Sequence, residues 1–169
     1  MNPRRLILLA VLLVAASCTS QRQGGGPESS AAGSLSSTAS AGAISIAPAD
    51  RPACAALFTR LQRVTGALSA SSELIANAVD KQQLSERISI EQAQLKQSAD
   101  LLAAGQVPPP LADANRQLVA ALRAFTADFA RAKAPAARGD FQAATDAMTD
   151  QPVVQRIIDA SKTIEDACG

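Results

Sequence analysis

The most reactive side chains of this 169-residue sequence are three cysteines, and the chain contains no histidine to act as their general base. Cys18 directly follows the small residues 15–17, which are preceded by the apolar run 6–14 and the basic residues 4–5. A basic start, an apolar run and small residues in this order are typical of a secretory signal. The chemistry that this position favours is therefore modification of the Cys18 sulfur during export.

This segment resembles the lipobox of bacterial lipoprotein precursors, in which small residues such as Ala16 and Ser17 precede the modified cysteine. Ala15 stands where that family most often has Leu. The resemblance covers residues 1–18 and implies that Cys18 carries a diacylglycerol, that cleavage occurs before it and that the new amine is often acylated, for example with palmitate. It thus implies a lipid anchor on the extracytoplasmic face of the cell membrane, where two acyl chains hold more firmly than one.

Three alternatives for the first 18 residues stay open. An ordinary cleaved signal peptide followed by a chance cysteine would leave the thiol unmodified. A retained transmembrane anchor conflicts with the short apolar run, because a spanning helix needs roughly 20 apolar residues. Arg4 and Arg5 suggest a twin-arginine signal, but Pro3 and residues 6–8 match that motif poorly.

The composition excludes several classes of function. The chain has no His, Trp or Tyr and only four Phe, so histidine-based triads, histidine-containing zinc and di-iron sites and tyrosine or tryptophan stacking platforms are absent. Removal of residues 1–17 takes away two of the 16 basic residues and none of the 15 acidic ones, which leaves a net charge of −1. We therefore expect no nucleic-acid partner and no cofactor.

The acidic residues show no spacing that suits a catalytic or metal-binding pair. Glu86 and Glu91 lie five positions apart and do not share one helix face, while Asp146 and Asp150 lie near an expected bend. No calcium loop is present, and the Glu-x-x-His element of bundle di-metal sites needs a histidine. We expect these acids to cap helices or to form a solvated face, and we expect no metal site and no catalytic residue.

Two further groups of side chains have a structural and a functional interpretation. Ser69, Ser71 and Ser72 interrupt an apolar stripe, and we favour a close helix crossing over a polar cavity. Phe125 and Phe129 are expected to pack in the core, with contact to an apolar ligand as the alternative.

The sequence divides into a signal peptide at 1–17, a lipidated Cys18 with a flexible tether at 18–49 and a helical domain at 50–169. The tether consists mainly of Ser, Ala, Gly and Thr, which cannot bury enough apolar surface to offset the ordering entropy. In the domain, apolar residues recur at steps of three and four.

The first helix is expected to start near Asp50 and Pro52, and the boundary with the second helix to lie near 77–81. The second helix is expected at about 82–104, and the third to end near Pro135. A short helix then precedes a last one that starts near Asp150 and Pro152. The expected apolar positions of these helices are Cys54, Leu57, Phe58, Leu61, Val64, Leu68, Ile75 and Val79; Leu84, Ile88, Leu95, Ala99 and Leu102; Leu111, Leu118, Leu122, Phe125 and Phe129; Phe141, Ala144 and Met148; and Val153, Val154, Ile157, Ile158 and Ile164.

Cys54 and Cys168 lie at opposite ends of this domain, and in an up-down-up-down bundle those two ends meet. Because an oxidising envelope permits the bond, we predict a Cys54–Cys168 disulfide; redox use of the two thiols lacks a CxxC spacing. The predicted fold is all-α, an antiparallel four-helix bundle closed by one disulfide. The domain also resembles, in its two cysteines and its proline break, small exported helical proteins of high-GC bacteria, a likeness that adds nothing to mechanism.

The function that these features favour is a non-enzymatic binding module, anchored to the membrane through Cys18, whose partner is an envelope protein or wall component. The alternative is a carrier or sensor of a small apolar molecule held between the helices. An enzyme that uses only carboxylates and serine is the third hypothesis. A large exposed apolar patch would favour the first, an internal apolar cavity the second, and two buried acids with raised pKa in one cleft the third.

Overall fold

A computed structural model describes residues 44–169, apart from the side chain of Ser71. The description concerns the compact unit Ala43–Gly169. Cys18, the lipobox and most of the expected tether lie outside the described residues. None of the helices described is long and apolar enough to cross a membrane.

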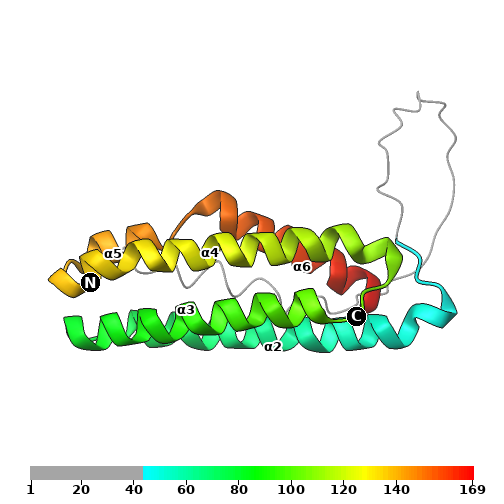
Figure 1. Ribbon diagram of the computed structural model, residues 1–169, viewed down its shortest axis with the longest axis horizontal. Coiled ribbons are helices and arrows are strands. Elements are labelled where there is room, and N and C mark those ends of the chain that lie inside the picture. Colours follow the sequence, from blue (N-terminus) through cyan, green and yellow to red (C-terminus); the bar gives the residue numbers. More distant parts are fainter. Residues whose placement is uncertain (1–43) are drawn as a thin grey trace, which may run out of the picture. The chain divides into compact units, whose positions relative to one another are not determined.

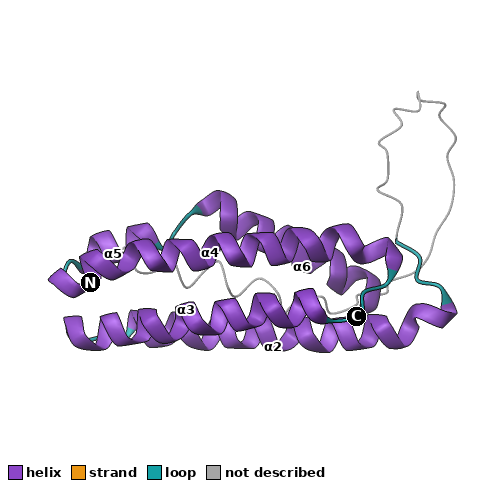
Figure 2. Ribbon diagram, viewed as in Figure 1, coloured by secondary structure: helices purple, strands orange, loops and turns teal. Residues whose placement is uncertain are grey.

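The described part is all-helical, with five α-helices and no strand (Figure 2). Two 3₁₀ turns, η1 (Pro48–Asp50) and η2 (Pro109–Leu111), precede helices. The α-helices are α2 (Arg51–Ala76), α3 (Lys81–Ala104), α4 (Ala112–Arg138), α5 (Phe141–Ala147) and α6 (Gln151–Cys168). They lie lengthwise beside one another, and α3 packs against both α2 and α4, while α6 packs against α2 and α4 (Figure 1).

The helix boundaries follow local start and stop signals. Asp80 and Asp150 each precede a helix and accept a hydrogen bond from the backbone N–H three residues later, at 2.8 Å and 3.4 Å. Asp50 also precedes a helix but makes no such bond with its side chain. The predicted boundary near 77–81 and the predicted start at Asp150 are confirmed.

The predicted end of the third helix near Pro135 is wrong, because α4 continues to Arg138. A proline within a helix removes one backbone N–H donor, and its ring clashes with the carbonyl of the preceding turn. The residues that follow the proline are still free to remain helical. The helix ends at Gly139, whose φ of 81° is left-handed. There the N–H of Asp140 donates to the carbonyl of Pro135 at 3.0 Å, which completes a C-terminal cap that glycine favours.

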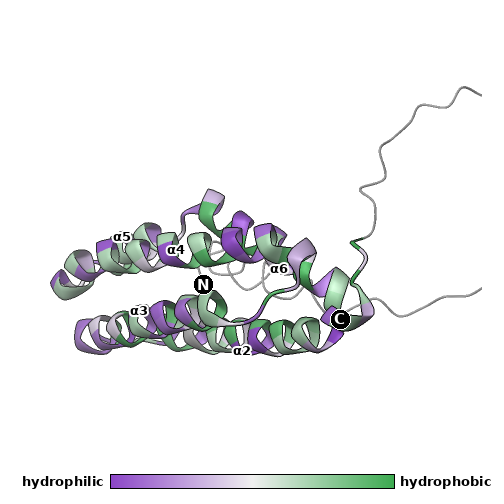
Figure 3. Ribbon diagram, turned by 45° about the vertical axis from the view of Figure 1, so that its right-hand side comes forward, coloured by the Kyte–Doolittle hydropathy of each residue, from purple (hydrophilic) through white to green (hydrophobic). Residues whose placement is uncertain are grey.

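Hydrophobic and hydrophilic residues share every helix (Figure 3), and the apolar side chains of one face form the core. Most predicted core positions are buried, with three clear exceptions. Val79 lies in the turn after α2 and is 78% exposed, while Phe141 and Ile158 are also exposed. Leu111 is buried, but it lies in η2 just before α4.

Candidate functional site: the outer face of α3

The two cysteines of the domain come together at one end of the helices. Cys54 lies in the first turn of α2 and is almost fully buried, and Cys168 is the last residue of α6. Their Cα atoms are 5.3 Å apart, and their sulfur atoms lie at disulfide-bonding distance. The structure thus joins the two residues that the sequence analysis paired, 114 positions apart.

The acidic residues divide into exposed and buried ones. Glu86 and Asp146 are exposed, as expected, and Asp150 caps α6. Glu91 is only 4% exposed, so the expectation of a solvated face is wrong for this residue. Its place in α3 explains the burial, because it falls on the same face as Ile88 and Leu95. Among residues 44–169, no group of three or more His, Cys, Asp or Glu side chains is arranged to hold a metal ion.

Asp128 on α4 is a buried acid that the sequence analysis did not single out. It is 1% exposed, and its Oδ1 accepts a hydrogen bond from the Arg131 guanidinium one turn later. Its Oδ2 has no hydrogen-bond partner among the described residues. Burial raises the pKa of Asp128, the charge of Asp150 raises it further, and Arg131 opposes the shift. Asp150 is only half-buried and its side chain caps α6, so the two acids do not form a pair of buried carboxyls in one cleft.

The serine and phenylalanine groups have structural roles. Ser69 and Ser72 are exposed, and each hydroxyl donates to the carbonyl four residues earlier, so the expected close helix crossing is wrong for them. The side chain of Ser71 lies outside the described residues. Phe125 and Phe129 pack edge to face with ring centroids 5.1 Å apart, which confirms their place in the core.

A second apolar row runs along α3, on the side that faces away from the core. We call it the outer stripe, and it consists of Ile90, Ala93, Gln97, Leu101 and Ala104, all of them exposed. The isoleucine and the leucine are 50% and 48% exposed, which is high for large apolar side chains. A shallow, open hollow of about 460 Å³ lies along most of this stripe. The stripe is therefore a helix face that the described helices leave uncovered.

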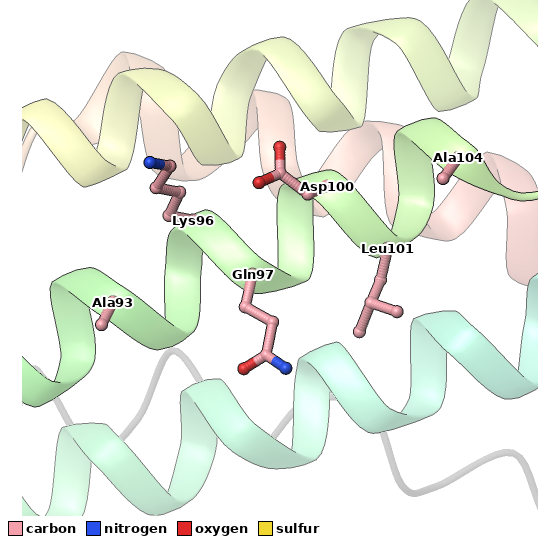
Figure 4. A pocket seen from close by; sticks show the side chains of 6 residues that line it. All are labelled: Ala93, Lys96, Gln97, Asp100, Leu101 and Ala104. Atoms are coloured by element: carbon pink, nitrogen blue, oxygen red, sulfur yellow. The ribbon is translucent and has the colours of Figure 1, made fainter.

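Charged residues border the outer stripe on one side. Figure 4 shows Lys96 and Asp100 on the side of α3 nearer α4, and Gln97 and Leu101 on the side nearer α2. Asp100 forms a long, exposed ion pair with Arg123 of α4 at 3.6 Å. In the hollow the stripe thus combines apolar area with one basic and one acidic side chain.

Two arginines link α2 to α3 through hydrogen bonds to backbone carbonyls. Arg87 of α3 donates to the carbonyl of Leu74 in the last turn of α2. Arg60 of α2 donates to the carbonyl of Gln106 at 2.6 Å, just beyond the end of α3. A Cβ atom at Gly105 would meet the Arg60 guanidinium, so a larger residue there would make this flexible side chain shift.

Comparisons with protein families, with curated proteins and with solved structures find no match to this chain. The sequence analysis named only the stripe of this helix that begins at Leu84, and it did not identify the outer stripe. The signal was present in the spacing of three, four, four and three residues from Ile90 to Ala104.

Proposed function

We propose that this protein is a membrane-anchored lipoprotein of the cell envelope that acts as a non-enzymatic interaction module. The observation that carries the proposal is the outer stripe of α3, which exposes two large apolar side chains, Ile90 and Leu101, in one row. Rows of this kind on an otherwise amphipathic helix are typical of surfaces that bind other proteins. The lipobox-like segment that ends at Cys18 supports the anchor.

We infer, in addition, that α2, α3, α4 and α6 form an antiparallel bundle closed by a Cys54–Cys168 disulfide. The contacts between neighbouring helices support this order, because residue numbers rise along one helix while they fall along the other. Between α2 and α3 the pairs are Arg60 with Gln106 and Leu74 with Arg87. Between α3 and α4 they are Gln92 with Thr126, Asp100 with Arg123 and Leu102 with Asn115.

The carrier alternative would place its ligand between the helices. There Phe125 and Phe129 contact each other, and Ile88, Leu95 and Leu122 are fully buried. Two hollows on the described residues lie instead along the outer stripe and beside the cysteine pair. The geometry therefore favours a binding surface over an internal binding site.

The anchor is tested by mass spectrometry of the protein extracted from its own membrane. We expect an N-terminal peptide that begins at Cys18 and carries acyl chains, and we expect the Cys18→Ser variant to leave the membrane fraction. An unmodified mature N-terminus, or a Cys18→Ser variant that stays in the membrane, would contradict the anchor.

The role of the outer stripe is tested by native electrophoresis of the protein extracted in mild detergent. We expect a complex larger than one chain, which Leu101→Glu dissolves because it places a charge in an apolar contact. Ile158→Glu is the matched control, since Ile158 is 41% exposed on α6, away from the stripe. An unchanged complex with Leu101→Glu would show that the stripe binds nothing.

A further inference from the structure

The Cys54–Cys168 pair is asymmetric, because its two residues lie at opposite ends of their helices and differ in exposure. Cys54 lies in the first turn of α2 and is 4% exposed, whereas Cys168 is the last residue of α6 and is only half-buried. A thiol–disulfide exchange begins when a thiolate reaches one of the two sulfurs, so access decides which one is attacked. The difference in exposure favours attack at Cys168.

An open hollow of about 310 Å³ lies beside the pair and offers a route to it. Both cysteines line this hollow, and its remaining walls are one isoleucine, two alanines and one arginine, which are Ile46, Ala55, Ala167 and Arg51. The short alanine side chains leave room beside the sulfurs for a group from another molecule. The guanidinium of Arg51 adds a positive charge to these apolar walls, and this charge attracts an anion such as a thiolate.

We propose that the Cys54–Cys168 disulfide is opened and re-formed in the folded protein by exchange with an external thiol, which enters this hollow and forms a mixed disulfide with Cys168. The chain is the substrate of this exchange, and the thiol belongs to a second molecule of the cell envelope. The inference rests on the bond inferred above and adds the sulfur at which that bond exchanges.

The exchange conserves atoms and electrons. The external thiolate attacks the Cys168 sulfur, a bond forms between these two sulfurs, and the bond from Cys168 to Cys54 breaks. The electron pair of the broken bond leaves with Cys54 as a thiolate, which then takes a proton from water. A second thiol of the partner attacks the mixed disulfide and releases Cys168, so the chain has gained the two electrons that the partner has lost. The reverse sequence re-forms the bond.

The surroundings of Cys54 suit the sulfur that leaves. Helix side chains lean toward the N-terminus of their helix, where the backbone carries partial positive charge, so the first turn of α2 favours a thiolate at Cys54. Cys168 lies at the opposite, negative end of α6. The Cys54 sulfur also lies 3.9 Å from the carbonyl oxygen of Ala167, which accepts a hydrogen bond from the thiol once the thiolate is protonated. The same geometry thus favours attack at Cys168 and departure of Cys54.

The test maps the mixed disulfide in the exported Cys18→Ser chain, in which Cys54 and Cys168 are the remaining cysteines. The chain is treated briefly with reduced glutathione, quenched with excess N-ethylmaleimide and digested, and mass spectrometry shows which cysteine carries which group. We expect glutathione on Cys168 and the maleimide on Cys54, in roughly ten-fold excess over the opposite isomer, because access controls the attack. The same treatment in urea, where the chain is unfolded, should yield the two isomers in similar amounts.

The possible results separate the exchange from the bond itself. Glutathione on Cys54, or equal isomers in the folded chain, overturns the inference and leaves the disulfide standing. A folded chain that forms no mixed disulfide, while the chain in urea forms both, overturns it as well. A chain that takes up two maleimides before glutathione is added has no disulfide; this result overturns the bond and the exchange together, but not the anchor or the interaction module.

The entry route is tested by a side chain that fills the hollow. Ala55→Leu should slow the formation of the mixed disulfide roughly ten-fold, because it places a larger group beside the sulfurs. Ala56→Leu is the matched control, since Ala56 is also exposed on α2 but lies outside the hollow. Both variants should keep the urea midpoint of the parent chain, so slower exchange would not reflect lost stability. Equal exchange rates for the two variants would overturn entry through the hollow.

Discussion

Reduction of the Cys54–Cys168 pair should destabilise the domain by several kcal/mol. The bond would close a loop of 114 residues, for which the chain-entropy model gives about 5 kcal/mol of stabilisation. Disulfides often deliver less than this value, and we expect a loss of about 3–5 kcal/mol. The reduced protein keeps both cysteine side chains, so its loss of stability reflects the cross-link rather than the packing of Cys54.

The assay is urea unfolding followed by the helical circular-dichroism signal, with and without a phosphine reductant. The exported Cys18→Ser chain is used, so that no third thiol is available for exchange. For a domain of this size the reductant should lower the midpoint by roughly 2 M urea. The Cys54→Ala/Cys168→Ala variant should not respond to the reductant. A wild-type midpoint that does not move would show that the sulfurs are not bonded and would refute the reasoning.

Three further predictions concern the helices, and all use urea unfolding of the same chain. Leu122→Ala should lower the free energy of unfolding by about 3 kcal/mol because Leu122 is fully buried, whereas Leu101→Ala should lower it by less than about 0.5 kcal/mol. Equal losses for the two variants would contradict the place of Leu122 in the core. Asp80→Ala should lower the free energy of unfolding by about 1 kcal/mol, because it removes the side-chain cap of α3. Asp50→Ala removes no such hydrogen bond and should lower it only slightly. A larger loss for Asp50→Ala than for Asp80→Ala would contradict the capping role of Asp80. Because burial raises the pKa of Asp128, the folded chain keeps a proton that the unfolded chain loses above the ordinary value of 3.8, so stability falls as pH rises from there through the folded pKa. Asp128→Asn should make that fall shallower, and an unchanged pH profile would contradict it.

Local signals in the sequence were sufficient for the type and approximate ends of the helices. The boundary near 77–81 and the start at Asp150 were predicted from composition and capping residues, and both are present. The end of α4 was not predicted correctly, because Pro135 resembles a stop signal. The helix ends instead at the left-handed turn at Gly139. A proline marks a conflict with the preceding turn, and only the following residues decide whether the helix goes on.

The burial of charged residues was harder to predict. Glu91 falls in step with Leu84, Ile88, Leu95 and Leu102, so its spacing already placed it on the inner face. A charge at such a position is usually read as polar surface, because burying a carboxylate is costly without partners. Whether such a position is buried depends on how the helices pack, which the pattern of a single helix does not contain.

Buried polar groups also explain how alanine-rich helices keep a single register. Alanines are interchangeable after a slip of one turn, so they specify the alignment of α3 and α4 only weakly. Asn115 of α4 is buried and donates from Nδ2 to the carbonyl of Leu102 at 3.2 Å. A slip of one turn would move it about 5.4 Å away and leave a buried donor unpaired, at a cost of about 1–3 kcal/mol. The same register sets Asp100 of α3 beside Arg123 of α4.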